Sequence, residues 1–270
     1  TGFDSDGYTA GSASAINANG SNIVSWNWLG ANGTASNTDG SITSTVSANT
    51  TAGFSIVKYT GTGSNATIGH GLGSVPKMII VKRLSNSENW TVYHNSLGNT
   101  KYIDLDATNV STTYNMWQNY TPTSSVFYIA THNRLNASGD DYIAYCFAEK
   151  TGYSKFGSYA GNQNNDGTFV YTGFKPAFVI IKRYSTGNPS TTNWQMFDSK
   201  RIGYNPLNYF LFPHLNNAED TSNPQWLDLH SNGFKIRNTG ADLNHSGHNY
   251  IYMAFGQSLV GSNNVPCTAR

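Results

Sequence analysis

The chain has 270 residues, a formal net charge of +1 and only 11% charged residues. An average soluble domain has about 25%, so we expect a surface made mainly of hydroxyl and amide groups. This composition argues against nucleic-acid binding, which needs clustered Lys and Arg. No apolar run reaches the roughly 20 residues of a membrane span, and 13% aromatic residues exclude disorder throughout.

An internal repeat organises the chain. Its clearest part is an Asn-x-x-Gly turn followed by a strand-like run that ends in an aromatic residue eight positions after the Gly. This pattern occurs at 17–28, 136–147 and 244–255. Asn and Gly favour the left-handed positions of tight turns, so each copy is predicted to be strand, turn, strand.

The front half of the repeat occurs only twice. Residues 76–83 match 176–183 in spacing, and Asn89-Trp90 is matched by Asn193-Trp194 after four extra residues. We therefore expect two complete copies and one back half, so that the chain begins in the middle of a repeat.

Short β-branched and aromatic runs bounded by Gly, Asn, Pro and Ser indicate strands, and no helical periodicity is sustained. The predicted fold is all-β, with tandem β-sandwich (jelly-roll-like) repeats, two of them complete and one partial at the N-terminus. The expected organisation is a truncated repeat at 1–29, a Gly/Ser/Thr/Asn-rich linker at 30–52, a β-sandwich repeat at 53–149, a connector at 150–165, a second β-sandwich repeat at 166–257 and a C-terminal tail at 258–270.

Two charged patterns have simple structural explanations. The pairs Lys82-Arg83 and Lys182-Arg183 suit an acidic glycan or phosphate, but their repetition favours the exit of a central strand. Asp4-Ser5-Asp6-Gly7 resembles the start of a calcium loop, yet the later ligands of such a loop are missing. We expect a turn there.

Histidine and cysteine patterns are equally weak evidence for a metal. His245 and His248 could hold a metal across a turn, but the other copies have Ala18 and Ala137 in place of His245. The two cysteines, Cys146 and Cys267, fit a buried core thiol and a tail thiol. No metal and no cofactor are expected.

Catalytic patterns are also missing. There is no G-x-S-x-G nucleophile motif, and the acidic residues are scattered among turn-forming residues. A glycosidase needs two carboxyl groups facing each other, and the sequence cannot pair Glu88, Asp198 or Glu219. We expect no enzyme activity, with a polysaccharide depolymerase kept as an alternative.

Aromatic residues next to amides favour carbohydrate binding, because flat rings pack against the C–H faces of sugars while amides bond their hydroxyls. The repeated Trp90 and Trp194 suit a core role better. The loops 114–120 and 204–209 differ between the copies and are the better candidates. The predicted binding residues are Trp117, Asn119, Tyr120, Tyr204, Asn205 and Tyr209.

Several longer motifs resemble a repeat domain of virion proteins from tailed phages, marine phages among them. They include residues 67–73 (TIGHGLG), 76–82 (PKMIIVK), 142–149 (YIAYCFAE), 152–159 (GYSKFGSY) and 250–255 (YIYMAF). The resemblance covers nearly the whole chain and brings no catalytic residues.

What this resemblance implies is a virion protein of the tail or fibre. The expected function is a receptor-binding adhesin that contacts a host surface glycan or protein, without inserting into a membrane. Expected partners are other virion proteins and further copies of the chain, a trimer by analogy with fibres. A capsid-decoration or fibre-shaft protein is the structural alternative.

Overall fold

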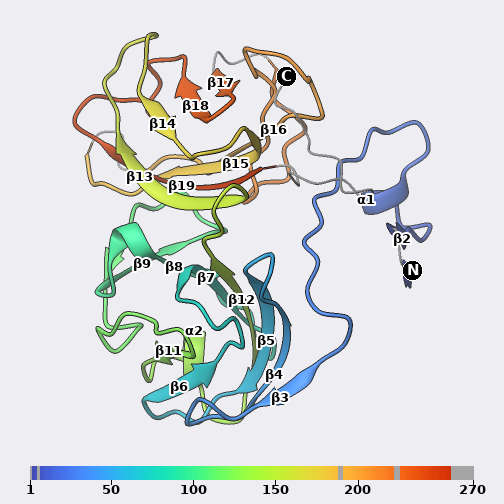
Figure 1. Ribbon diagram of the computed structural model, residues 1–270, viewed down its shortest axis with the longest axis vertical. Helices are drawn as coiled ribbons and strands as arrows, with labels where there is room; N and C mark the ends of the chain where they lie inside the picture. Colours follow the sequence, from blue (N-terminus) through green and yellow to red (C-terminus); the bar gives the residue numbers. More distant parts are fainter. Residues whose placement is uncertain (1, 5–6, 188–190, 222–225, 257–270) are drawn as a thin grey trace.

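The computed structural model describes residues 2–4, 7–187, 191–221 and 226–256. Within these ranges the sheets are antiparallel and the helical segments are only three or four residues long. The all-β class predicted from the sequence is therefore confirmed. Figure 1 shows most strands gathered into two bodies, which we call the first and the second sandwich.

The first sandwich has an eight-stranded and a two-stranded sheet around one core. Successive side chains of a strand point to opposite faces, and Val57, Tyr59 and Tyr142 point into this core. In spatial order the large sheet consists of β10 (Thr112–Thr113), β9 (Lys101–Asp104), β8 (Thr91–His94), β7 (Pro76–Arg83), β12 (Asp141–Ala148), β5 (Phe54–Thr60), β4 (Ser44–Asn49) and β3 (Ala35–Asn37). The small sheet pairs β6 (Ala66–Gly69) with β11 (Val126–Ile129), and the connections contain η1 (Asn95–Leu97) and α2 (Asn133–Asn136).

The second sandwich repeats this plan with fewer strands. Its core lies between a four-stranded and a three-stranded sheet and contains Val179, Ile181 and Phe234. The larger sheet consists of β13 (Ser154–Ala160), β19 (Asn249–Gly256), β15 (Pro176–Arg183) and β16 (Gln195–Asp198). The smaller sheet consists of β14 (Phe169–Tyr171), β18 (Gly233–Ile236) and β17 (Leu227–His230).

A third apolar layer joins the two sandwiches, because their large sheets pack on each other through the faces opposite to their own cores. Its phenylalanines are Phe54, Phe147, Phe156, Phe178 and Phe255. Polar contacts of buried side chains cross this junction. Among them, His94 Nε2 lies 3.2 Å from Tyr252 O, and the Trp194 indole donates to Asp104 O (2.9 Å). Burial lowers the pKa of His94 to about 4, so its ring is neutral near pH 7.

The same contacts occur in both sandwiches. In each, two stacked tyrosines join neighbouring strands. They are Tyr59 and Tyr142 in the first sandwich, with ring centroids 5.2 Å apart, and Tyr159 and Tyr250 in the second (5.0 Å). A buried asparagine holds the adjacent turn, Asn136 in the first sandwich and Asn244 in the second. Each asparagine accepts a hydrogen bond from the N–H that follows a glycine, Thr62 N (2.7 Å) or Asn162 N (2.9 Å). A Cβ at Gly61 or Gly161 would lie 2.3 Å from a carbonyl oxygen, so both positions require glycine.

The N-terminal segment differs from its prediction. It contains the hairpin β1 (Gly2–Asp4) and β2 (Gly7–Thr9) and the short helix α1 (Ser14–Asn17), but the strand expected at 23–28 is not formed. β12 and β19 each pair with a strand on both sides, whereas no described strand pairs with 23–28. Trp28 instead packs on the junction, 5.3 Å from Phe178 and 5.5 Å from Phe255 between ring centroids.

The two segments expected as linker and connector contain strands. Residues 30–52 include β3 and β4, and residues 150–165 include β13. Their Ser, Thr, Asn and Gly content hides a partial alternation in burial: on β4, Ser44 and Val46 are buried and Thr45 between them is exposed. The tail expected at 258–270 lies outside the described residues.

Candidate functional site

The predicted binding loop 114–120 divides into a buried and an exposed part. Trp117 is 1% exposed, donates its indole N–H to Lys101 O (3.1 Å) and packs edge-on against Tyr93. Its ring therefore belongs to the core of the first sandwich and has no face free for a ligand. Sequence position alone could not separate this tryptophan from its exposed neighbours.

The exposed part of this loop presents two tyrosines. Tyr120 is 59% exposed, and its ring centroid lies 5.0 Å from that of Tyr128 on β11. Tyr114 is 51% exposed and meets the ring of His132 edge-on at 5.2 Å. Tyr120 is the predicted residue that the structure places at the surface with an aromatic neighbour, while Tyr114, Tyr128 and His132 were not predicted.

The loop has an unusual backbone that is held by side chains. Gln118 and Asn119 have φ values of 53° and 58°, a left-handed conformation that is uncommon for residues other than glycine. The Gln118 amide donates to Ala66 O and Ile129 O (2.8 Å each), and Asn99 donates to Asn119 O (2.8 Å). Strained backbone held in this way is concentrated at functional sites. The loop is thus ordered before any ligand arrives.

The second predicted loop, 204–209, lies on the second sandwich. Tyr204 is 70% exposed. The Asn205 amide both donates to Leu229 O and accepts from Leu229 N (2.9 Å each), so it extends the edge of β17 and is occupied. Tyr209 is half-buried. The two predicted loops belong to different sandwiches and do not form one site.

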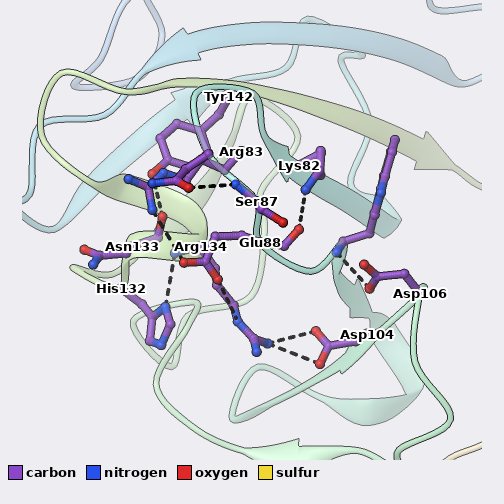
Figure 2. A network of polar contacts seen from close by, with 12 residues as sticks. Lys82, Arg83, Ser87, Glu88, Asp104, Asp106, His132, Asn133, Arg134 and Tyr142 are labelled. Atoms are coloured by element: carbon purple, nitrogen blue, oxygen red, sulfur yellow. Dashed lines mark hydrogen bonds and ion pairs between the residues drawn. The ribbon is translucent and has the colours of Figure 1, made fainter.

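A network of charged side chains lies close to His132 (Figure 2), the residue whose ring meets Tyr114. Arg134 on α2 donates to both oxygens of Asp104 (2.9 and 3.2 Å) and lies 3.7 Å from Glu88 Oε2. Arg83 at the end of β7 pairs with Glu88 (3.5 Å) and with Asp140. Each of these carboxylates therefore has an arginine partner.

The electrostatics of this network follow from burial. Burial raises the pKa of Asp104 and outweighs the opposing effect of Arg134. Burial and Arg134 together lower the pKa of His132, whose Nδ1 accepts from Arg134 N at the start of α2 (3.2 Å). The network joins α2 to β7 and β9 and gives the Tyr114 side of the loop a rigid base.

The corresponding charges of the second sandwich are buried. Lys182 and Arg183 are both 0% exposed, and Lys182 donates to Thr108 O (2.9 Å) and to Thr192. Burial lowers the pKa of Lys182 to about 7, against the opposing effect of Asp242. The pair does end a central strand, as expected, but it is buried rather than at an exit to solvent, and Lys182 makes internal contacts.

The carboxylates considered for hydrolysis are engaged in ion pairs. Asp198 and Glu219, which the sequence could not relate, meet at Arg201, whose Nε contacts Asp198 and whose Nη1 contacts Glu219. The Arg201 guanidinium also lies 6.0 Å from the ring centroid of Trp26. Glu88 is paired with arginine as described above.

Other candidate features carry little chemistry. A surface hollow of about 360 Å³ beside β3 is lined by residues 31–37, Val46, Ala48 and Gly71, none of which is titratable. No group of three metal-binding side chains occurs among the described residues, and the rings of His245 and His248 lie 4.9 Å apart. Cys146 is a buried free thiol, as predicted, while Cys267 lies outside the described part. No helix in that part is long and apolar enough to span a membrane.

Comparison with known families covers nearly the whole chain. Residues 1–258 match a domain of unknown function, DUF7483, and the chain belongs to this family. No curated protein and no solved structure matches it.

Proposed function

We propose that the protein is a non-enzymatic adhesin of a phage virion, part of a tail or fibre, and that it contacts a host surface glycan through the loop 114–120. Tyr120 stacks on a sugar ring, and Asn119 contributes its exposed amide. The virion setting comes from the sequence motifs, and the binding role comes from the loop.

One observation carries the binding role: two exposed tyrosines stand on a loop whose strained backbone is already fixed. Gln118 anchors that backbone through two hydrogen bonds of 2.8 Å. A ligand that meets an ordered loop does not pay the entropy of ordering it, so exposed aromatic area converts more fully into affinity. Loops on a rigid β scaffold are also where binding residues usually lie.

The binding role is tested with Tyr120→Ala in the full chain. Fluorescently labelled protein is applied to cells of the host, and retention is measured by flow cytometry. We expect retention to fall by about tenfold, a typical loss for one stacked aromatic ring. Tyr8→Ala, which removes a tyrosine 44% exposed at the N-terminal hairpin, is the matched control and should bind like the wild type.

The virion setting needs a separate experiment. Particles are labelled with gold-tagged antibody against the chain and imaged. Gold at the distal tail supports adsorption, gold on the head favours a decoration protein, and gold on no particle contradicts the virion assignment. A trimer of this chain is expected by analogy with fibres, and sedimentation of the purified protein measures its oligomeric state.

The depolymerase alternative predicts a different outcome. The protein would lower the viscosity of a surface polysaccharide, and Glu88→Gln or Asp198→Asn would abolish this effect. We expect no change in viscosity.

A further inference from the structure

The outer face of the small sheet in the second sandwich carries exposed aromatic side chains. This sheet lies at the end of the molecule remote from the first sandwich (Figure 1). Phe169 and Tyr171 on β14 are 43% and 65% exposed, and Trp226 before β17 is 40% exposed. The register sets Tyr171, Gly233 and His230 side by side across the three strands. We call this surface the outer face.

Two glycines lie beside the aromatic rings of β14. A Cβ at Gly233 would come 2.9 Å from Phe169 Cζ, so the ring of Phe169 covers this glycine. A Cβ at Gly173 would have the Tyr171 hydroxyl and ring as its nearest atoms, from 3.6 Å. Phe169 also meets His230 edge-on at 5.7 Å. Phe169 and Tyr171 thus have neighbours on one side and remain about half open to solvent, 43% and 65%, which leaves aromatic surface for a sugar ring.

The charges of the outer face neutralise each other. Lys235 pairs with Asp166 (2.5 Å), and Arg237 pairs with both Asp166 (3.5 Å) and Asp228 (3.4 Å). Two cations are therefore matched by two anions around the aromatic residues. A polyanion would have to displace the carboxylates and a polycation the basic groups, so charge complementarity favours an uncharged ligand with many hydroxyls.

In the first sandwich the strand that corresponds to β14 is β6, and it carries no aromatic residue. The outer strand of its small sheet, β6, is covered by an earlier part of the chain: Ser41 N donates to Thr67 Oγ1 (2.8 Å), and Ile42 forms a bridge with Ile68. Asn37 lies over Gly69, where a Cβ would come 1.7 Å from its side-chain oxygen. The exposed aromatic residues of β14 are thus a feature of the second sandwich rather than a consequence of the shared plan.

We propose that the outer face binds a neutral glycan chain. Its sugar rings stack on Phe169 and Tyr171, and its hydroxyls bond His230 and the paired charges of Lys235 and Asp228. This surface is distinct from the loop 114–120 and does not depend on the virion setting, so the two proposals stand or fall separately.

The experiment is affinity electrophoresis of the full chain in native gels that contain a polysaccharide. The neutral probes are hydroxyethyl cellulose, dextran and galactomannan, and the acidic probe is alginate. We expect at least one neutral probe, and not alginate, to retard the wild type. Tyr171→Ala should weaken that retardation by about tenfold, while Tyr171→Phe should retain it because the ring remains.

The variants separate binding from folding and from the first proposal. Tyr171 is largely exposed, so Tyr171→Ala should keep the melting temperature of the wild type. Tyr120→Ala, on the other surface, should be retarded like the wild type. Retardation by alginate alone, by no probe, or equally in Tyr171→Ala would overturn the proposal. So would a dimer in sedimentation that Tyr171→Ala dissociates, because that result would make the outer face a protein interface.

Discussion

Lys182 provides a sharp test of the electrostatics of the second sandwich. Its ammonium is fully buried and donates to Thr108 O and to Thr192, which links the two sandwiches. Arg183, Asp242 and His214 are the charged or titratable groups that interact with it. Burial lowers its pKa to about 7, whereas an unfolded lysine titrates near 10.4.

The sign and size of the effect follow from these two values. Between pH 7 and pH 10.4 the unfolded chain holds a proton that the native chain has lost, so the free energy of unfolding increases with pH, by up to about 1.4 kcal/mol per unit. The penalty for burying the charge is complete below pH 7 and disappears above pH 10.4. From pH 7 to pH 9 we expect the wild type to gain about 2 kcal/mol relative to Lys182→Met.

The assay is urea unfolding of both proteins at several pH values from 7 to 9. Cys146 and the buried tyrosines have raised pKa values, which lower the free energy of unfolding at high pH. Because these groups are present in both proteins, their contribution cancels when the free energy of unfolding of Lys182→Met is subtracted from that of the wild type. Lys82→Met, at the matching position of the first sandwich, controls for the change in net charge. A difference between wild type and Lys182→Met that stays constant over this range would refute the reasoning.

Three further predictions concern packing. Trp28→Ala should lower the free energy of unfolding by about 2–3 kcal/mol, because the indole packs on the junction. The control Leu29→Ala changes a side chain that is 76% exposed and should alter this free energy by less than about 0.5 kcal/mol. Denaturant titration measures both variants. Asn244→Ala removes several hydrogen bonds of a buried side chain and should lower the free energy of unfolding by about 2–4 kcal/mol. The control Asn17→Ala loses one exposed hydrogen bond and should lower it little. Equal decreases in melting temperature for the two variants would contradict this prediction. Cys146 should resist a thiol reagent in the native protein and react only on unfolding, because burial raises its pKa and blocks access; fast reaction in native buffer would show that the first core opens readily.

Local pattern was sufficient for much of the fold. The repeated pattern predicted a strand, a tight turn and a strand, with Asn and Gly at left-handed positions. Asn136 and Asn244 do not have positive φ values, and the strands before the turns, β11 and β18, belong to the other sheet of each sandwich, so no hairpin is formed. Gly139 and Gly247 do have positive φ values and are followed by β12 and β19, as predicted. This succeeded because turn chemistry and alternation are properties of neighbouring residues. The same pattern at 23–28 did not produce a strand, because a strand also needs hydrogen-bonding partners that are distant in sequence.

Burial and proximity were decided only by the tertiary structure. Trp117 and Tyr120 lie three residues apart in one polar loop, yet one is a core side chain and the other is a surface ring, because the left-handed turn at Gln118 and Asn119 reverses the chain between them. The aromatic residues of the outer face showed no pattern in the sequence, since strand register brings Phe169 and Tyr171 next to residues more than sixty positions away. Composition determined what kind of surface this protein has, and the pairing of distant strands determined where on it the aromatic rings lie.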